Sequence, residues 1–125
     1  MLLDTDVLIW YMRGNPKAAA FVAGLPAFSL SAVTYMEVVQ GMRNKRELLA
    51  LRRVLRSWRA PVLPVTEAVT GRAVAYVEQH FLSHAVRLAD ALVAATAVEH
   101  GFPLATANAK HYRPIRELSL HLFVP

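Results

Sequence analysis

The acidic residues of this chain fall at positions where carboxylates could do chemistry together. Asp4 follows the apolar residues 1–3, which predict a short buried strand, and the chain then turns at Asp4-Thr5-Asp6 into an apolar helix. A carboxylate at the carboxyl end of a central strand lies at the crevice where open α/β sheets bind ligands. Glu37 and Asp90 occur in mostly apolar helical sequence, where a charge is costly unless it has a partner. A hard divalent cation bound among the three acids would supply that partner.

The chemistry such a site would perform follows from the cation and from the overall charge. Mg²⁺ or Mn²⁺ takes oxygen ligands, retains several waters and accepts phosphate oxygens. Bound by Asp4, Glu37 and Asp90, it could activate water and neutralise charge on a phosphodiester. The chain has 14 Lys and Arg against 9 Asp and Glu, a net charge of +5, which favours RNA or DNA as a partner. The absence of cysteine excludes disulfides, thiolate nucleophiles and zinc–thiolate sites.

Each acid also has a purely structural interpretation. Asp4 or Asp6 could cap the helix that follows. Glu37 lies three residues after Thr34, as in a capping box. Asp90 could pair with Arg87 or favour the positive end of its helix dipole. Taken together they are harder to explain in this way, because they come from three separated segments that each lie near a helix start or a strand end.

The elements that must position these residues alternate along the chain. At 125 residues the sequence predicts one domain, residues 1–125. Helices are expected at 5–13, 17–23, 31–42, 47–58, 67–81 and 89–100, and strands at 1–3, 27–30, 61–64, 104–106 and 118–123. Short strands alternating with helices predict an α/β fold with a mostly parallel sheet.

The amino-terminal sequence and the hydropathy indicate a soluble, cytoplasmic protein that does not enter a membrane. No apolar run reaches the roughly 18–20 residues that a spanning helix needs, and no basic region precedes the first apolar stretch, as a signal peptide would require. The hydrophobic fraction of 55% is high and predicts that apolar surface is buried against a partner or a second copy.

Four segments of the chain resemble the PIN-domain ribonucleases, in the order that family has them. They are Leu3-Asp-Thr-Asp-Val-Leu-Ile9, Ser31-Ala-Val-Thr-Tyr-Met-Glu-Val-Val-Gln-Gly41, Leu88-Ala-Asp-Ala-Leu-Val-Ala-Ala-Thr-Ala97 and Leu104-Ala-Thr-Ala-Asn-Ala-Lys-His-Tyr112. The resemblance extends from Met1 to about Ile115. No single motif is very specific, but four in register over one short domain are. The sequence looks most like the VapC-type toxins of toxin–antitoxin pairs.

The resemblance implies a fold, an activity and partners. The fold would be a three-layer α/β/α sandwich with a central, mostly parallel sheet of four to five short strands. The activity would be that of a Mg²⁺- or Mn²⁺-dependent endoribonuclease, which hydrolyses RNA phosphodiester bonds by a metal-activated water. The protein would act as the toxin of a toxin–antitoxin pair, as a homodimer that a cognate antitoxin holds inactive.

The same resemblance assigns residues to the site. Asp4 and Asp90 match the main metal ligands, and Glu37 matches a further ligand or a base that positions the water. The fourth position, often Asp in the family, is Asn108 here, so a second metal would bind weakly or only with substrate. Asp6 is expected to support the strand–helix turn and to orient Asp4. Thr106 is expected to support the site. Three further residues are expected to contact substrate phosphates: Lys110, His111 and Arg113.

Two other functions remain open from the sequence. A degenerate PIN domain would bind RNA or a protein without cutting, and the replacement of an acid by Asn108 is its only support. A haloacid-dehalogenase-like phosphatase would use Asp4 as nucleophile and Asp6 as acid. That class needs a pair of late acids, and the only acids after Asp90 are Glu99 and Glu117.

Two further groups of residues have weaker interpretations. His80 and His84 could share a helix face as zinc ligands, although no third ligand is nearby. Three arginines, Arg52, Arg56 and Arg59, could line an RNA groove by neutralising phosphates, or could form a solvated helix face.

Overall fold

Neighbouring residues of the two central strands point to opposite faces of the sheet. In β1 (Leu2–Leu3) and β4 (Leu104–Thr106), Leu2 and Leu104 pack into one core cluster, whereas Leu3 and Ala105 pack into another. This is the two-residue period of a strand that is buried on both faces. Helices must therefore cover the sheet on both sides.

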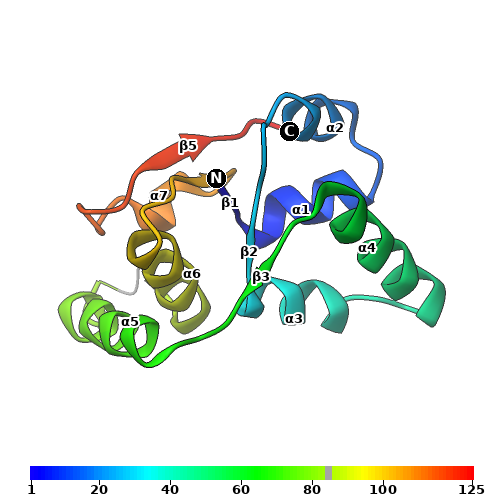
Figure 1. Ribbon diagram of the computed structural model, residues 1–125. Coiled ribbons are helices and arrows are strands. Elements are labelled where there is room, and N and C mark those ends of the chain that lie inside the picture. The colour runs from blue at the N-terminus through cyan, green and yellow to red at the C-terminus, as the bar shows by residue number, and fades with distance from the viewer. Residues whose placement is uncertain (84–85) are drawn as a thin grey trace.

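The computed structural model describes residues 1–83 and 86–125 (Figure 1). Its helices are α1 (Thr5–Met12), α2 (Pro16–Ala23), α3 (Ala32–Gln40), α4 (Lys45–Trp58), α5 (Glu67–His80), α6 (Leu88–Glu99) and α7 (Ala109–Tyr112). The other strands are β2 (Leu30–Ser31), β3 (Val62–Leu63) and β5 (Leu120–Leu122). His84, which the sequence paired with His80 as a zinc ligand, lies outside the described residues.

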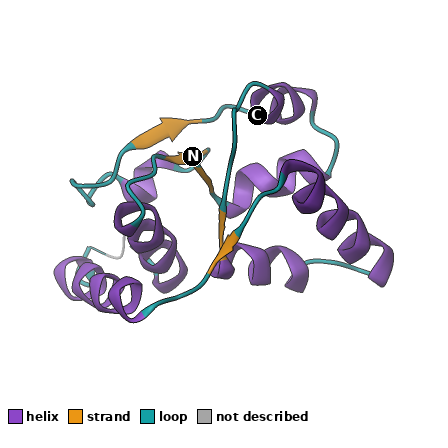
Figure 2. Cartoon of the chain, in the orientation of Figure 1, coloured by secondary structure: helices purple, strands orange, loops and turns teal. Residues whose placement is uncertain are grey.

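All strand pairs in the described chain are parallel. β4 pairs with β1 on one side and with β5 on the other, and β2 pairs with β3. A bridge between Leu2 and Ser29, with the Leu3 N–H donating to the Ser29 carbonyl at 3.1 Å, joins β1 to the β2 segment. The bridge joins the two sheets, so the spatial order is β3-β2-β1-β4-β5, with short strands connected through helices (Figure 2).

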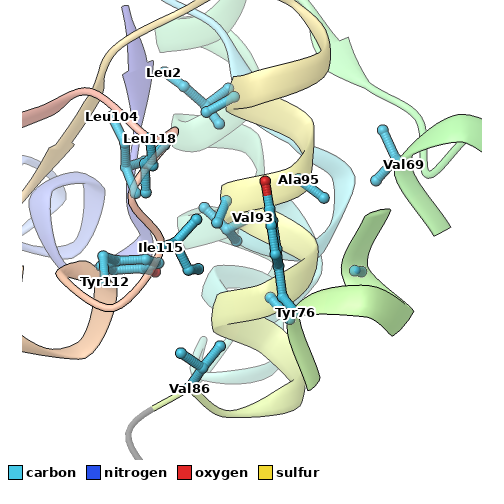
Figure 3. Close-up of a cluster of buried hydrophobic side chains, with 14 residues drawn as sticks. Leu2, Val69, Tyr76, Val86, Val93, Ala95, Leu104, Tyr112, Ile115 and Leu118 are labelled. Carbon is cyan, nitrogen blue, oxygen red and sulfur yellow. The ribbon is translucent and has the colours of Figure 1, made fainter. Parts of the chain in front are cut away.

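Two helical layers enclose this sheet. α5 and α6 lie side by side on one face, where Tyr76, Val93 and Ile115 belong to the same buried cluster as Leu2 and Leu104 (Figure 3). On the opposite face, α1, α2, α3 and α4 contribute apolar side chains to the cluster that contains Leu3, Leu30 and Ala105. The predicted three-layer α/β/α sandwich with a parallel sheet of short strands is confirmed.

Two helices begin at a hydroxyl residue that caps the first turn. The Ser31 hydroxyl accepts from the Val33 N–H at the start of α3, and the Thr66 hydroxyl accepts from the Val69 N–H at the start of α5. At the end of α6, Gly101 has a φ of +66°, a conformation that glycine adopts without steric cost.

The differences from the predicted elements are local. Strand β2 ends at Ser31, beyond the predicted 27–30, because the same residue pairs with Leu63 in the sheet and caps α3. The sequence did not predict α7, which has only four residues and therefore too little periodicity to be detected. Within residues 1–83 and 86–125, no helix is long and apolar enough to cross a membrane.

Candidate active site

The predicted site residues follow the carboxyl ends of parallel strands, which meet at one edge of the sheet. Asp4 comes directly after β1, Thr106 is the last residue of β4, and α3, which carries Glu37, starts directly after β2. Asp90 lies in the first turn of α6. This edge is where open parallel sheets place their ligands.

Asp4 is a buried carboxylate that accepts hydrogen bonds at both oxygens. Its Oδ1 accepts from the Thr5 N–H at 2.8 Å, and its Oδ2 accepts from the Thr106 hydroxyl at 2.8 Å. The residue is only 7% exposed. Burial, with a smaller contribution from the charge of Asp6, raises the pKa of Asp4 to about 6, although the bonds from Thr106 and Thr5 act in the opposite direction. Ionised Asp4 therefore lacks sufficient neutralisation from the protein alone.

Glu37 is held next to Asp4 through Thr5. The Thr5 hydroxyl donates to Glu37 Oε1 at 2.7 Å, while the Thr5 N–H is bound to Asp4. The capping-box interpretation of Glu37 is wrong, because Ser31 caps α3 and Thr34 lies inside the helix, fully buried. Glu37 itself is exposed, so its carboxylate faces solvent from a fixed position.

Asp90 approaches the same region from α6. Its Oδ2 accepts from the Arg87 backbone N–H at 3.3 Å and lies 3.9 Å from His111 Nδ1. The buried Tyr112 hydroxyl is influenced by both Asp90 and Asp4. The pKa of the Tyr112 hydroxyl is raised, mainly by burial and then by the negative charges of Asp4 and Asp90, so this hydroxyl lies in the field of both carboxylates.

The donor set suits a hard cation, although the side chains do not enclose one by themselves. Among residues 1–83 and 86–125, no three acidic or histidine side chains lie close enough together to hold a metal ion. The convergence of Asp4, Glu37 and Asp90 on one ion therefore stays a prediction. A buried carboxylate with a raised pKa, in a site whose acidic side chains offer oxygen ligands, fits Mg²⁺ or Mn²⁺, which keeps several waters in its coordination shell.

The remaining predicted residues divide into two groups. Asp6 and Asn108 contact each other, with Asn108 Nδ2 donating to Asp6 Oδ2 at 3.0 Å. Lys110 and Arg113 are exposed on and just after α7, whereas His111 is half-buried beside Asp90.

The sequence did not single out two residues that the structure places in this site. Thr5 links Asp4 to Glu37, and its position between two aspartates was the available signal. Tyr112 is 1% exposed and faces Asp4 and Asp90, but nothing in the sequence distinguished it from an ordinary core tyrosine.

Comparisons with known proteins agree with this fold. Residues 1–116 match the PIN domain family, and the chain belongs to that family. It is 34% identical over 131 positions to Ribonuclease VapC10 of Mycobacterium tuberculosis, covering 100% of this chain and 95% of that protein. The resemblance to PIN-domain proteins and VapC-type toxins that the sequence predicted is thereby confirmed.

Solved structures with the same fold come from toxin–antitoxin complexes. A toxin–antitoxin complex from Klebsiella pneumoniae contains a chain with 28% identity and a TM-score of 0.77, with 94% of this chain and 93% of that chain covered. VapBC2 from Rickettsia felis, bound to a DNA fragment from its promoter, matches with a TM-score of 0.83 and covers 98% of each chain. At 17% identity, the second match shows the fold alone.

The phosphatase alternative is wrong for a PIN domain, and the geometry explains why. A phosphatase of that class would need the Asp6 carboxyl free to transfer a proton. Asp6 Oδ2 instead accepts from the Ala107 N–H at 2.9 Å and from Asn108 Nδ2, and Oδ1 accepts from the Val7 N–H at 2.7 Å.

Proposed function

We propose that this protein is a Mg²⁺- or Mn²⁺-dependent endoribonuclease and the toxin of a toxin–antitoxin pair. One observation carries the proposal: a buried, under-neutralised Asp4 lies at the carboxyl edge of a parallel sheet, beside Glu37 and in a shared field with Asp90. The similarity to Ribonuclease VapC10 along the whole chain supports RNA as the substrate.

Asp4 and Asp90 would hold the cation, because they are the two carboxylates that act most strongly on the Tyr112 hydroxyl, ahead of Asp6. A divalent ion bound there would supply an activated water and neutralise the charge of the phosphodiester. Thr106 and Thr5 keep the Asp4 carboxylate oriented by donating to its two oxygens. Asn108 is not required as a ligand in this proposal.

Glu37 would accept the proton of the attacking water. Its Oε1 is fixed by the Thr5 hydroxyl, and the residue is open to solvent, as a general base that works on water must be. Lys110 and Arg113, exposed near the same edge, would contact flanking phosphates of the RNA. His111 lies close enough to Asp90 to adjust its orientation.

The proposed partners are a cognate antitoxin and a second copy of the chain. Similar structures come from toxin–antitoxin complexes, which supports an antitoxin partner. An apolar hollow of about 550 Å³ lies between α3 and α6, beside Glu37, and Met36 and Leu88 are 54% and 70% exposed there. A homodimer formed through this surface would bury these side chains and bring two sites together. RNA and an antitoxin would both be met in the cytoplasm, which is the location we propose.

The activity is tested by cleavage of total cellular RNA and a labelled oligonucleotide, with EDTA, Mg²⁺ or Mn²⁺. We expect cleavage only with a divalent ion, and a loss of about 100-fold or more for Asp4→Asn and Asp90→Asn. Glu78→Gln, an exposed change on α5, is the matched control and should cleave normally. Cleavage in EDTA, or equal cleavage by Asp4→Asn, would contradict the mechanism.

The same assay separates the alternative of a degenerate PIN domain. Such a protein would bind RNA in a gel-shift experiment without cleaving it under any metal condition. Mapping of RNA ends after induced expression would identify the target and the cut position.

A further inference from the structure

Asp6 is a half-buried carboxylate, and both of its oxygens accept hydrogen bonds from other groups of the protein. Oδ2 accepts from the Ala107 N–H at 2.9 Å and from Asn108 Nδ2 at 3.0 Å, and Oδ1 accepts from the Val7 N–H at 2.7 Å. The Thr106 hydroxyl makes a fourth, longer contact with Oδ2 at 3.5 Å, so three of the four donors belong to residues 106–108, about 100 residues away in sequence. Asp6 therefore ties the start of α1 to that turn.

Three polar groups of Asn108 form hydrogen bonds within the protein. Besides the bond from its Nδ2 to Asp6, its backbone N–H donates to the Thr106 hydroxyl oxygen at 3.0 Å, and its carbonyl accepts from the His111 N–H at 3.0 Å. The side-chain amide has one chemically sensible orientation, because flipping it would place Oδ1 against Asp6 Oδ2, two acceptors with no proton between them.

This arrangement determines where the Thr106 hydroxyl points. The Asn108 N–H donates to the Thr106 oxygen, and the single hydroxyl proton of Thr106 points to Asp4 Oδ2 at 2.8 Å rather than to Asp6 Oδ2, which lies farther away at 3.5 Å. A chain of contacts thus runs from Asp6 through Asn108 and Thr106 to Asp4. The two aspartates repel each other directly, yet Asp6 supports Asp4 through the turn.

We propose that Asp6 and Asn108 form a clasp that sets the Thr106 hydroxyl on Asp4, and that Asn108 is a positioning residue and no metal ligand. The inference rests on the proposed function for the role of Asp4. It differs from the expectation that Asn108 is a weaker fourth ligand. It also implies that each chain takes one divalent ion, held without the residue at position 108.

A carboxylate at position 108 would be incompatible with the clasp. Asn108→Asp would replace the Nδ2 donor by an oxygen at hydrogen-bond distance from Asp6 Oδ2. Two carboxylates at that separation cannot both be ionised without a large cost. In this chain the amide at position 108 therefore complements the carboxylate at position 6.

The clasp is tested first without metal, by a double-mutant cycle. Asp6→Ala, Asn108→Ala and the double variant are unfolded thermally in EDTA. We expect Asn108→Ala to lower the Tm by about 3 °C or more in the wild-type background and by little in the Asp6→Ala background. The cycle cancels the relief of Asp4–Asp6 repulsion that Asp6→Ala also brings. Asn44→Ala, which removes the side-chain cap of α4, is the control and should be additive with Asp6→Ala.

The second measurement is Mn²⁺ binding by titration calorimetry without RNA. We expect one ion per wild-type chain, and for Asn108→Ala an unchanged stoichiometry with a Kd roughly three- to tenfold higher. Thr106→Val should have a similar effect, whereas Asn44→Ala should leave the Kd unchanged. If Asn108→Ala does not fold, Asn108→Ser, which keeps a shorter donor, is measured instead with the same expectations.

Three results would overturn the inference. The first is that the Tm changes caused by Asp6→Ala and Asn108→Ala are additive in the double variant. The second is that the wild type binds two Mn²⁺ ions and Asn108→Ala binds only one. The third is that Asn108→Asp binds a second ion while its Tm in EDTA equals that of the wild type. Absence of any Mn²⁺ binding by the wild type would count against the proposed function, while the coupling measured in EDTA would still decide the clasp.

Discussion

Replacing Asp4 by asparagine is expected to stabilise the metal-free protein at neutral pH. Asp4 is 7% exposed, and burial and the charge of Asp6 raise its pKa from 3.8 to about 6. Each pKa unit corresponds to about 1.4 kcal/mol, so keeping Asp4 ionised at pH 7 costs the folded state about 3 kcal/mol. Asparagine is neutral and can still bond to both neighbours, because its amide nitrogen can donate to the Thr106 hydroxyl oxygen.

The sign of the pH dependence follows from the same shift. Between pH 3.8 and about 6, folded Asp4 holds a proton that the unfolded chain has lost, so the wild type loses stability as the pH rises through this range. Asp4→Asn has no such loss. The free energy of unfolding of Asp4→Asn should be nearly equal to that of the wild type at pH 4. Above pH 6 it should exceed the wild-type value by about 1–3 kcal/mol, which corresponds to a Tm increase of about 3–10 °C.

The assay is thermal or urea unfolding of both proteins in EDTA from pH 4 to pH 8. Saturating Mn²⁺ should make the wild type the more stable of the two proteins. A Mn²⁺ concentration 100 times the Kd stabilises the wild type by about 2.7 kcal/mol and Asp4→Asn by much less. Glu78→Gln is the control for removing an exposed carboxylate. A difference that does not change with pH, or an Asp4→Asn protein less stable than wild type at pH 7 in EDTA, would refute the reasoning.

Three further predictions concern positioning, assembly and RNA binding. Thr5→Val removes the hydroxyl that holds Glu37 and should lower kcat about tenfold with an unchanged Mn²⁺ Kd. Thr5→Ser keeps the hydroxyl and should have a normal kcat, whereas a normal kcat in Thr5→Val would contradict this role. Met36→Asp should convert the proposed dimer to a monomer in light scattering, whereas Leu49→Asp on α4 should not; a monomeric wild type would exclude this interface. Joint alanine replacement of the three arginines at 52, 56 and 59, which line a hollow of about 590 Å³, should reduce the salt dependence of RNA binding by about 2 in log–log slope, and an unchanged slope would leave them a solvated face.

The fold was largely predictable because its local signals agree with its tertiary structure. Ser31 and Thr66 mark helix starts in the sequence and cap those helices in the structure. Apolar residues 2 and 3 predict a strand, and both prove fully buried on opposite faces. The boundaries shifted where one residue has two roles, as Ser31 does.

The contacts within the site could not be predicted from sequence alone. The sequence showed that Asp4 and Glu37 belong near strand ends, but only the packing of α1 against α3 shows that Thr5 joins them. Asn108 was an uncertain ligand because its amide direction depends on Asp6, which lies 102 positions away. Contacts between distant segments decide such details, and local patterns carry no information about them.

The pairing of the first strand with one of the last has a consequence for synthesis. Asp4 and Thr106 are separated by 102 residues, and β1 lies between β2 and β4 in the sheet. While the ribosome is still translating, the amino-terminal segment has emerged without the neighbour that completes its surroundings. A nascent chain therefore holds Asp4 without its bond from Thr106 until β4 has left the ribosome, so the proposed site forms only late in synthesis.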